Sequence, residues 1–76
     1  MNKRSVADLK TGERATIQSF TDETMSLKLL EMGCLPGAQV YLSAKAPLGD
    51  PICLNVAGYV LAMRRAEAAT ILIDND

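Results

Sequence analysis

Apolar and polar residues alternate along several short segments of this chain, and this period of two is typical of β-strands with one buried face. The predicted strands cover residues 14–19, 38–45, 52–58, 59–64 and 70–74, with a short helical turn at residues 66–69. The apolar side chains expected on the buried face of the first three strands are Ile17, Val40, Leu42, Ala44, Ile52, Leu54 and Val56.

The period changes to that of an α-helix in residues 21–33. Thr21 or Asp22 can accept backbone N–H bonds as the N-cap, and the acidic Asp22 and Glu23 suit the positive end of the helix dipole. Apolar side chains follow at helical spacing, namely Met25, Leu29 and Met32, with Leu30 widening the stripe. Because so short a helix is marginal alone in water, we expect the stripe to pack against other elements.

Glycine and proline residues mark the predicted turns. Gly33 stands at the end of the helix, where a left-handed residue is favoured. Pro36 and Gly37 fit a type II turn, because proline presets one φ angle and glycine supplies the positive φ that follows. The residues expected to shape turns are Gly33, Pro36, Gly37, Pro47, Pro51 and Gly58.

The segment APLGDP, residues 46–51, joins two predicted strands and is longer than a tight hairpin requires. Pro47 and Pro51 restrict the unfolded chain, so holding this loop ordered costs less conformational entropy. Gly49 and Asp50 turn the chain and leave Leu48 near the tip. Two interpretations stay open: Leu48 folds back to plug the end of the fold, or it is exposed as a contact for a partner.

Five short strands, one helix after the first strand and frequent turns predict a mainly β fold. We expect a small closed β-barrel with the helix over one open end. Closure would leave no exposed edge strand.

Composition narrows the classes of function. The net charge of −1, with scattered basic residues, argues against a nucleic-acid partner. Two tyrosines and one phenylalanine are too few for a groove that binds proline-rich peptides or a platform that stacks bases. The longest apolar-rich stretch, Ile52–Met63, is shorter than the roughly 18 residues of a membrane span. No signal-peptide pattern is seen, so we expect a soluble, cytoplasmic protein.

Candidate chemistry is sparse. The chain has no histidine, which removes the commonest general base and metal ligand. Its nine acidic residues are dispersed, and no glycine-rich phosphate loop occurs. Cys34 and Cys53 are expected to be reduced and to act as small apolar side chains, with a reactive thiol as the alternative. We therefore predict no catalytic residue, no metal ligand and no cofactor.

The segments LKLLEMGCLPGAQV and APLGDPICLNVAGYVLAMRRAEAATILI, in this order, resemble the FeoA family, small cytosolic accessory proteins of bacterial ferrous-iron uptake. The resemblance covers about residues 9–73 and implies one domain over residues 1–76. It implies a small SH3-like β-barrel of about five strands with one α-helix inserted after the first strand. It also implies a non-enzymatic role beside FeoB, the membrane ferrous-iron transporter with a cytosolic GTP-binding domain. Lys28 stands where the family often has arginine, and lysine cannot make a bidentate contact.

We therefore expect an interaction protein that binds the cytosolic GTP-binding region of FeoB and meets the membrane only through the transporter. The residues expected at the contact are Leu48, Gly49 and Asp50, with Leu29, Met32 and Gly33 shaping the adjacent surface. Two alternatives stay open: the chain binds Fe(II) itself, or it regulates GTP hydrolysis by FeoB through Arg64 or Arg65. The oligomeric state is also open.

Overall fold

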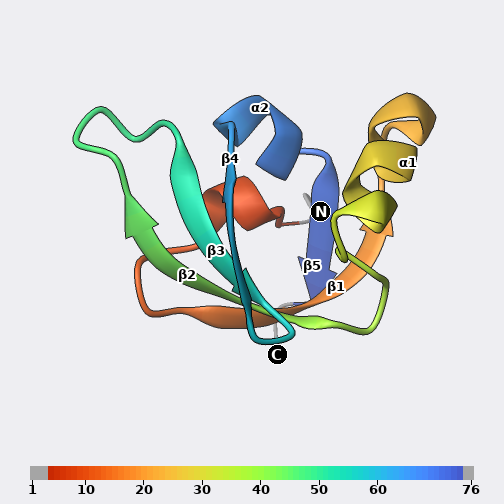
Figure 1. Ribbon diagram of the computed structural model, residues 1–76, viewed down its shortest axis with the longest axis horizontal. Coiled ribbons are helices and arrows are strands. Elements are labelled where there is room, and N and C mark those ends of the chain that lie inside the picture. The colour runs from red at the N-terminus through yellow and green to blue at the C-terminus, as the bar shows by residue number, and fades with distance from the viewer. Residues whose placement is uncertain (1–3, 75–76) are drawn as a thin grey trace.

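The computed structural model describes residues 4–74. In chain order the elements are the 3₁₀ helix η1 (Val6–Asp8), β1 (Arg14–Phe20), α1 (Glu23–Glu31), β2 (Gln39–Lys45), β3 (Ile52–Val56), β4 (Tyr59–Met63), α2 (Arg65–Ala68) and β5 (Ile71–Asp74). The predicted mainly β class is confirmed, with the main helix directly after the first strand (Figure 1). The predicted helical turn before the last strand is α2.

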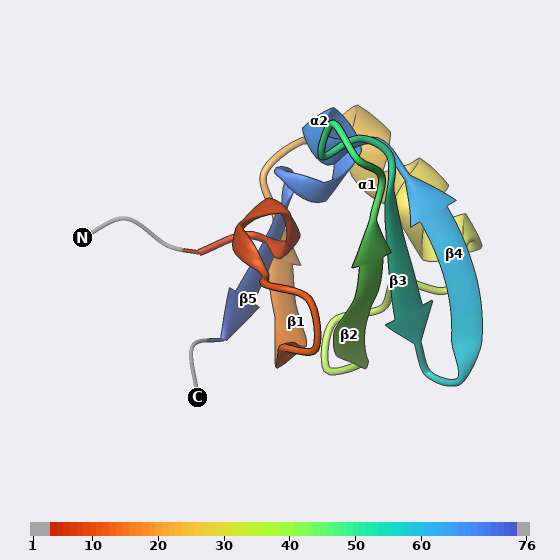
Figure 2. The same ribbon diagram turned by 90° about the vertical axis from the view of Figure 1, so that its left-hand side faces the viewer.

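The five strands form one antiparallel sheet in the order β4-β3-β2-β1-β5. Figure 2 shows the strands side by side, with α1 and α2 at one end of the curved sheet. The predicted closure without edges is wrong for the described residues, because β4 and β5 do not pair with each other. The N-terminal segment takes the outer edge of β5 instead. Ser5 bridges to Leu72, and the Ile73 N–H donates to the Arg4 carbonyl at 3.0 Å.

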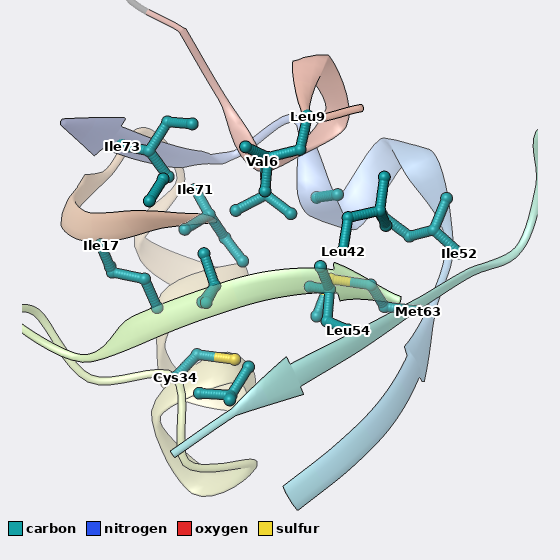
Figure 3. Close-up of a cluster of buried hydrophobic side chains, with 14 of the residues drawn as sticks. Val6, Leu9, Ile17, Cys34, Leu42, Ile52, Leu54, Met63, Ile71 and Ile73 are labelled. Carbon is teal, nitrogen blue, oxygen red and sulfur yellow. The ribbon is translucent and has the colours of Figure 1, made fainter. Parts of the chain in front are cut away.

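The core lies on the concave side of the sheet and draws on every element (Figure 3). Its buried apolar residues are Val6, Leu9, Ala15, Ile17, Leu29, Cys34, Val40, Leu42, Ile52, Leu54, Val56, Met63, Ala68, Ile71 and Ile73. Six of the seven side chains predicted to face inward are in this set. Cys34 is fully buried, as expected of an apolar filler, and burial raises the pKa of its thiol. Val6 was missed by the sequence pattern, which begins after it.

Ala44 is the inward prediction that is wrong, because it is exposed. The register of β2 against β3 shifts between Leu42 and Ala44, so that Leu42 opposes Leu54 but Ala44 opposes Cys53. Such a bulge inserts an extra residue and reverses the side-chain alternation that follows. Ala44 therefore shares the outward side of the sheet with Cys53.

Helix α1 begins and packs as its sequence predicts. Asp22 is the N-cap, and its carboxylate accepts the Met25 N–H at 3.0 Å. Leu29 is fully buried, and Met25 and Met32 pack half-buried against the core. The expectation for Leu30 is wrong, because it is 37% exposed. One residue along a helix rotates a side chain by about 100°, so Leu30 leaves the face that buries Leu29.

The turns that follow α1 also match the sequence. Gly33 has φ +97°, the positive value that ends a helix without the strain a Cβ would add. Gly37 has φ +92°, and the Ala38 N–H donates to the Leu35 carbonyl at 3.0 Å. This is the predicted type II turn with Pro36 and Gly37 at its centre. Both turns return the chain from the helix to the sheet.

Candidate functional site

The loop of residues 46–51 is closed by its own backbone. The Gly49 N–H donates to the Ala46 carbonyl at 2.7 Å, and the Ala46 N–H donates to the Pro51 carbonyl at 3.0 Å. At the tip, Leu48 is 95% exposed. Of the two interpretations of Leu48, the plug is therefore wrong, and Figure 1 shows the loop between β2 and β3 projecting away from the sheet.

Asp50 joins this loop to α2. Its carboxylate accepts the backbone N–H of Arg65, the first residue of α2, at 2.9 Å. Next to it, the Arg64 N–H donates to the Glu67 carboxylate at 3.0 Å. First-turn N–H groups have no partner within a helix, so both carboxylates satisfy groups that would otherwise need water. Asp50 thus fixes the base of the loop relative to the helix.

A salt bridge joins α2 to α1. Lys28 Nζ lies 2.5 Å from Glu67 Oε2, and unlike the planar guanidinium of arginine it does not make a two-bond fork with the carboxylate. The Lys28 ammonium, helped by the Arg64 N–H, lowers the pKa of Glu67 below its ordinary value. We call the surface formed by residues 46–51, α2 and α1 the upper rim. Its three parts are connected by Asp50 and by Glu67.

The structure divides the six residues predicted for partner binding. Leu48, Gly49 and Asp50 lie together on the projecting loop. Leu29 is fully buried, so a direct contact of this residue with a partner is excluded and it can only support the surface from beneath. Met32 is half-buried and Gly33 exposed. Figure 1 shows the loop and α1, which carries Leu29, on opposite sides of α2, so the predicted adjacency is wrong for Leu29.

Sequence reasoning missed other exposed apolar side chains. Leu27 on α1 is 67% exposed and Leu35 after it is 52% exposed, while on β4 Tyr59 is 73% and Val60 69% exposed. The helical period does flag Leu27, since it lies off the stripe that carries Leu29. For β4 the sequence pattern did not show which face of the strand is buried, because apolar residues occupy both faces.

A second charged contact ties the N-terminal segment to the start of β1. The Arg4 guanidinium donates two hydrogen bonds to the Glu13 carboxylate, at 2.7 and 2.9 Å. The Lys10 N–H donates to the same carboxylate at 3.0 Å. These bonds, that of Arg4 above all, lower the pKa of Glu13 from 4.5 to about 2. Glu13 therefore holds the segment that covers the edge of β5.

From this pKa we expect the fold to lose stability in acid. The Glu13 carboxyl is more acidic in the folded than in the unfolded chain, so its stabilisation is complete above pH 4.5 and is lost as the pH falls toward about 2. Because the pair is partly exposed, solvent screens it and the loss is small. Urea unfolding over this range should show a smaller acid loss in Glu13→Gln than in wild type. Equal losses would contradict the assignment.

Removing the Asp50 carboxylate should loosen α2 and the loop together. We expect Asp50→Ala to lower the free energy of unfolding by about 0.5–2 kcal/mol, the usual cost of losing a side-chain cap. Asp50→Asn keeps a carbonyl oxygen as acceptor and should retain most of this energy. Urea titration of the three proteins tests the prediction. Equal losses in both variants would mean that the hydrogen bond to Arg65 is not what stabilises the junction.

Neither a metal centre nor a membrane helix is found in the part of the chain that the structure describes. Within residues 4–74, no three side chains of histidine, cysteine, aspartate or glutamate are grouped so that they could hold a metal ion. The helices of the same residues are all too short or too polar to span a bilayer. The feature that remains as a candidate site is the exposed apolar tip of the loop at residues 46–51.

Comparison with known proteins identifies related sequences over nearly the whole chain. The family described as FeoA domain matches residues 4–75. A curated relative from Porphyromonas gingivalis, an Fe(2+) transport protein A/Fe(2+) transporter FeoB fusion protein, is 31% identical over 70 residues, or 91% of this chain. The chain spans 8% of the length of that fusion protein.

Solved structures share the fold. A FeoA-like protein from Clostridium acetobutylicum is 30% identical, with a TM-score of 0.87 over 97% of this chain and 88% of that one. A FeoA from Stenotrophomonas maltophilia, solved with zinc, is 26% identical, with a TM-score of 0.82 over 93% of this chain and 89% of that one. It is described as a prokaryotic SH3 domain protein and proposed as a ferrous-iron-transport activating factor. The expected SH3-like class is thereby confirmed.

Proposed function

The chain belongs to the FeoA family, and on this premise we propose that it is a non-catalytic accessory protein of ferrous-iron uptake that binds the cytosolic GTP-binding region of FeoB. The proposal places it in the cytoplasm, next to the membrane only through the transporter. In the fusion protein of P. gingivalis, a FeoA sequence and FeoB share one polypeptide, which supports a functional association of the two.

The observation that carries the proposal is the exposed Leu48 on a loop that is already ordered. Exposing a leucine to water over 95% of its surface forgoes the stabilisation that burial gives, about 1.5–3 kcal/mol. Hydrogen bonds within the loop and from Arg65 to Asp50 hold the tip in place. A partner that covers Leu48 gains this burial without first ordering the loop.

The test is a binding measurement between the purified chain and the isolated cytosolic region of FeoB. The immobilised FeoB region should retain the folded chain. An unrelated SH3 domain of similar size serves as the control. Retention of the chain but not of the control is the expected result. Failure of FeoB to retain the folded chain would contradict the partner.

The same mixture separates binding from regulation. GTP hydrolysis by the FeoB region is measured with and without a saturating amount of the chain. An accessory role in binding predicts retention with an unchanged rate of hydrolysis. A changed rate that Arg64→Ala abolishes would instead support the regulatory alternative and overturn the purely accessory role.

A further inference from the structure

Strand β4 is an edge of the sheet, and the register shows which of its backbone groups face outward. Val56 and Tyr59 close a two-residue turn over Ala57 and Gly58, both of which have positive φ. In such a hairpin the closing pair is hydrogen-bonded, and hydrogen-bonded pairs then alternate along the strands. Tyr59, Leu61 and Met63 therefore bond to β3. The N–H and C=O groups of Val60 and Ala62 point away from the sheet.

The N–H groups on either side of this open stretch are satisfied within the chain. The Gly58 N–H donates to the Asn55 side chain at 3.1 Å, and the Arg64 N–H donates to the Glu67 carboxylate at 3.0 Å. Val60 and Ala62 make no further backbone hydrogen bond to residues 4–74 beyond any within their own hairpin. The open stretch thus presents two donors and two acceptors, arranged evenly about Leu61.

The two edges of the sheet differ in how they are protected. The edge of β5 is covered by the N-terminal segment, through Ser5 and Arg4. Strand β4 has no such cover from the described residues, and its sequence YVLAM has neither a charge nor a proline. Tyr59 and Val60 are 73% and 69% exposed. Edge strands that stay unpaired usually carry a charge, a proline or a bulge that prevents association.

We propose that β4 pairs with β4 of a second copy of this chain, antiparallel and about a two-fold axis at Leu61. In this register Val60 lies opposite Ala62 of the second copy, and Ala62 opposite its Val60. The two donors and two acceptors of each edge then find partners, which gives four hydrogen bonds. An interface of this kind uses the same surface on both copies, as two-fold dimers do.

Charge and side-chain size permit this pairing. Arg64, the nearest charged residue, falls opposite Gly58 of the second copy, which has no side chain to clash. The two Arg64 side chains lie at opposite ends of the paired strands, so they repel each other weakly. Since only a short stretch pairs, the buried area falls short of the roughly 1,200 Å² of stable complexes, and the dimer forms only at high concentration.

Sedimentation equilibrium of the isolated chain tests the dimer between about 10 μM and about 1 mM. The average mass of wild type should rise toward that of two chains. Val60→Lys should weaken association at least about tenfold, because the two lysines are diagonal neighbours on one face of the paired strands. Leu27→Lys, at a similarly exposed leucine on α1, should associate as wild type does. A wild type that stays monomeric would overturn the proposal.

Amide hydrogen exchange locates the interface in the wild-type chain. Because it needs no substitution, misfolding of a variant cannot affect the result. In wild type, exchange at the Val60 and Ala62 amides should slow as the concentration rises, since these amides become bonded only in the dimer. Exchange at Tyr59 and Leu61, already bonded to β3, should change much less. Association with slowed exchange elsewhere and not at Val60 and Ala62 would overturn the pairing. Because no FeoB is present, the outcome is independent of the proposed function.

Discussion

Replacing Leu29 by alanine should lower the free energy of unfolding by about 2–5 kcal/mol, the range for leucine-to-alanine changes in protein cores. Leu29 is fully buried, and it is the only residue of α1 whose side chain is so enclosed. Its loss leaves a cavity and removes the contact that holds the helix on the sheet. For a 76-residue domain this is a large fraction of the total stability.

Leu27→Ala is the matched control for this prediction, because it makes the same chemical change two residues away on the same helix. Leu27 is 67% exposed, so the loss should stay within about 0.5 kcal/mol. Urea unfolding followed by circular dichroism gives both values. If the two variants lost equal stability, the burial of Leu29 would not explain the effect, because alanine is itself a better helix former than leucine, and the packing described for α1 would be wrong.

Features set by residues close together in the sequence could be predicted. The Asp22 cap, the buried Leu29 and the positive φ of Gly33 and Gly37 each follow from local chemistry. The alternation in β3 also placed its side chains correctly, because this strand has one buried face and no bulge. The number and order of the strands and of the two α-helices follow from these local patterns, whereas the 3₁₀ helix η1 was not predicted.

Features that depend on distant segments could not be predicted. The bulge that turns Ala44 outward is a property of β2 paired with β3, and neither strand alone reveals it. The sequence pattern predicted no element in the N-terminal segment, yet Val6 is fully buried there and its neighbour Ser5 bridges to Leu72, far along the chain. That same bridge lies on the edge of β5, and within residues 4–74 β4 and β5 do not pair to close the sheet.

The candidate site was predicted only in part, because its local features follow from the loop sequence whereas its position in the fold depends on distant segments. The two prolines and the glycine of residues 46–51 indicated a stiff loop. Whether Leu48 is buried or exposed depends on how this loop packs against the rest of the fold, and the loop sequence alone does not show that. The hydrogen bond from the Arg65 N–H to Asp50 joins residues fifteen apart in the sequence and ties the loop to α2. Helix α1, which carries the Leu29 that the sequence grouped with the loop, is separated from the loop by α2, as Figure 1 shows.

Leu48→Asp should abolish most of the binding to the cytosolic region of FeoB while leaving the fold intact. A single apolar anchor at the centre of an interface can contribute 2 kcal/mol or more, so we expect at least about a tenfold weaker complex. An aspartate covered by the partner would also lose its hydration without gaining an opposite charge. Because Leu48 is 95% exposed, the free energy of unfolding should change by less than about 0.5 kcal/mol.

Leu27→Asp supplies the comparison, since it places the same charge at an exposed leucine of α1, across α2 from the loop. Calorimetric titration of the FeoB region with wild type and both variants should show weakened binding for Leu48→Asp alone. If Leu27→Asp weakened binding and Leu48→Asp did not, the contact surface would be α1 rather than the loop. If neither did, both ends of the upper rim would be excluded as the contact. A braced loop with an exposed leucine predicts the first outcome, because Leu48 has more surface left to bury than Leu27, at 95% against 67%, and its loop is already ordered.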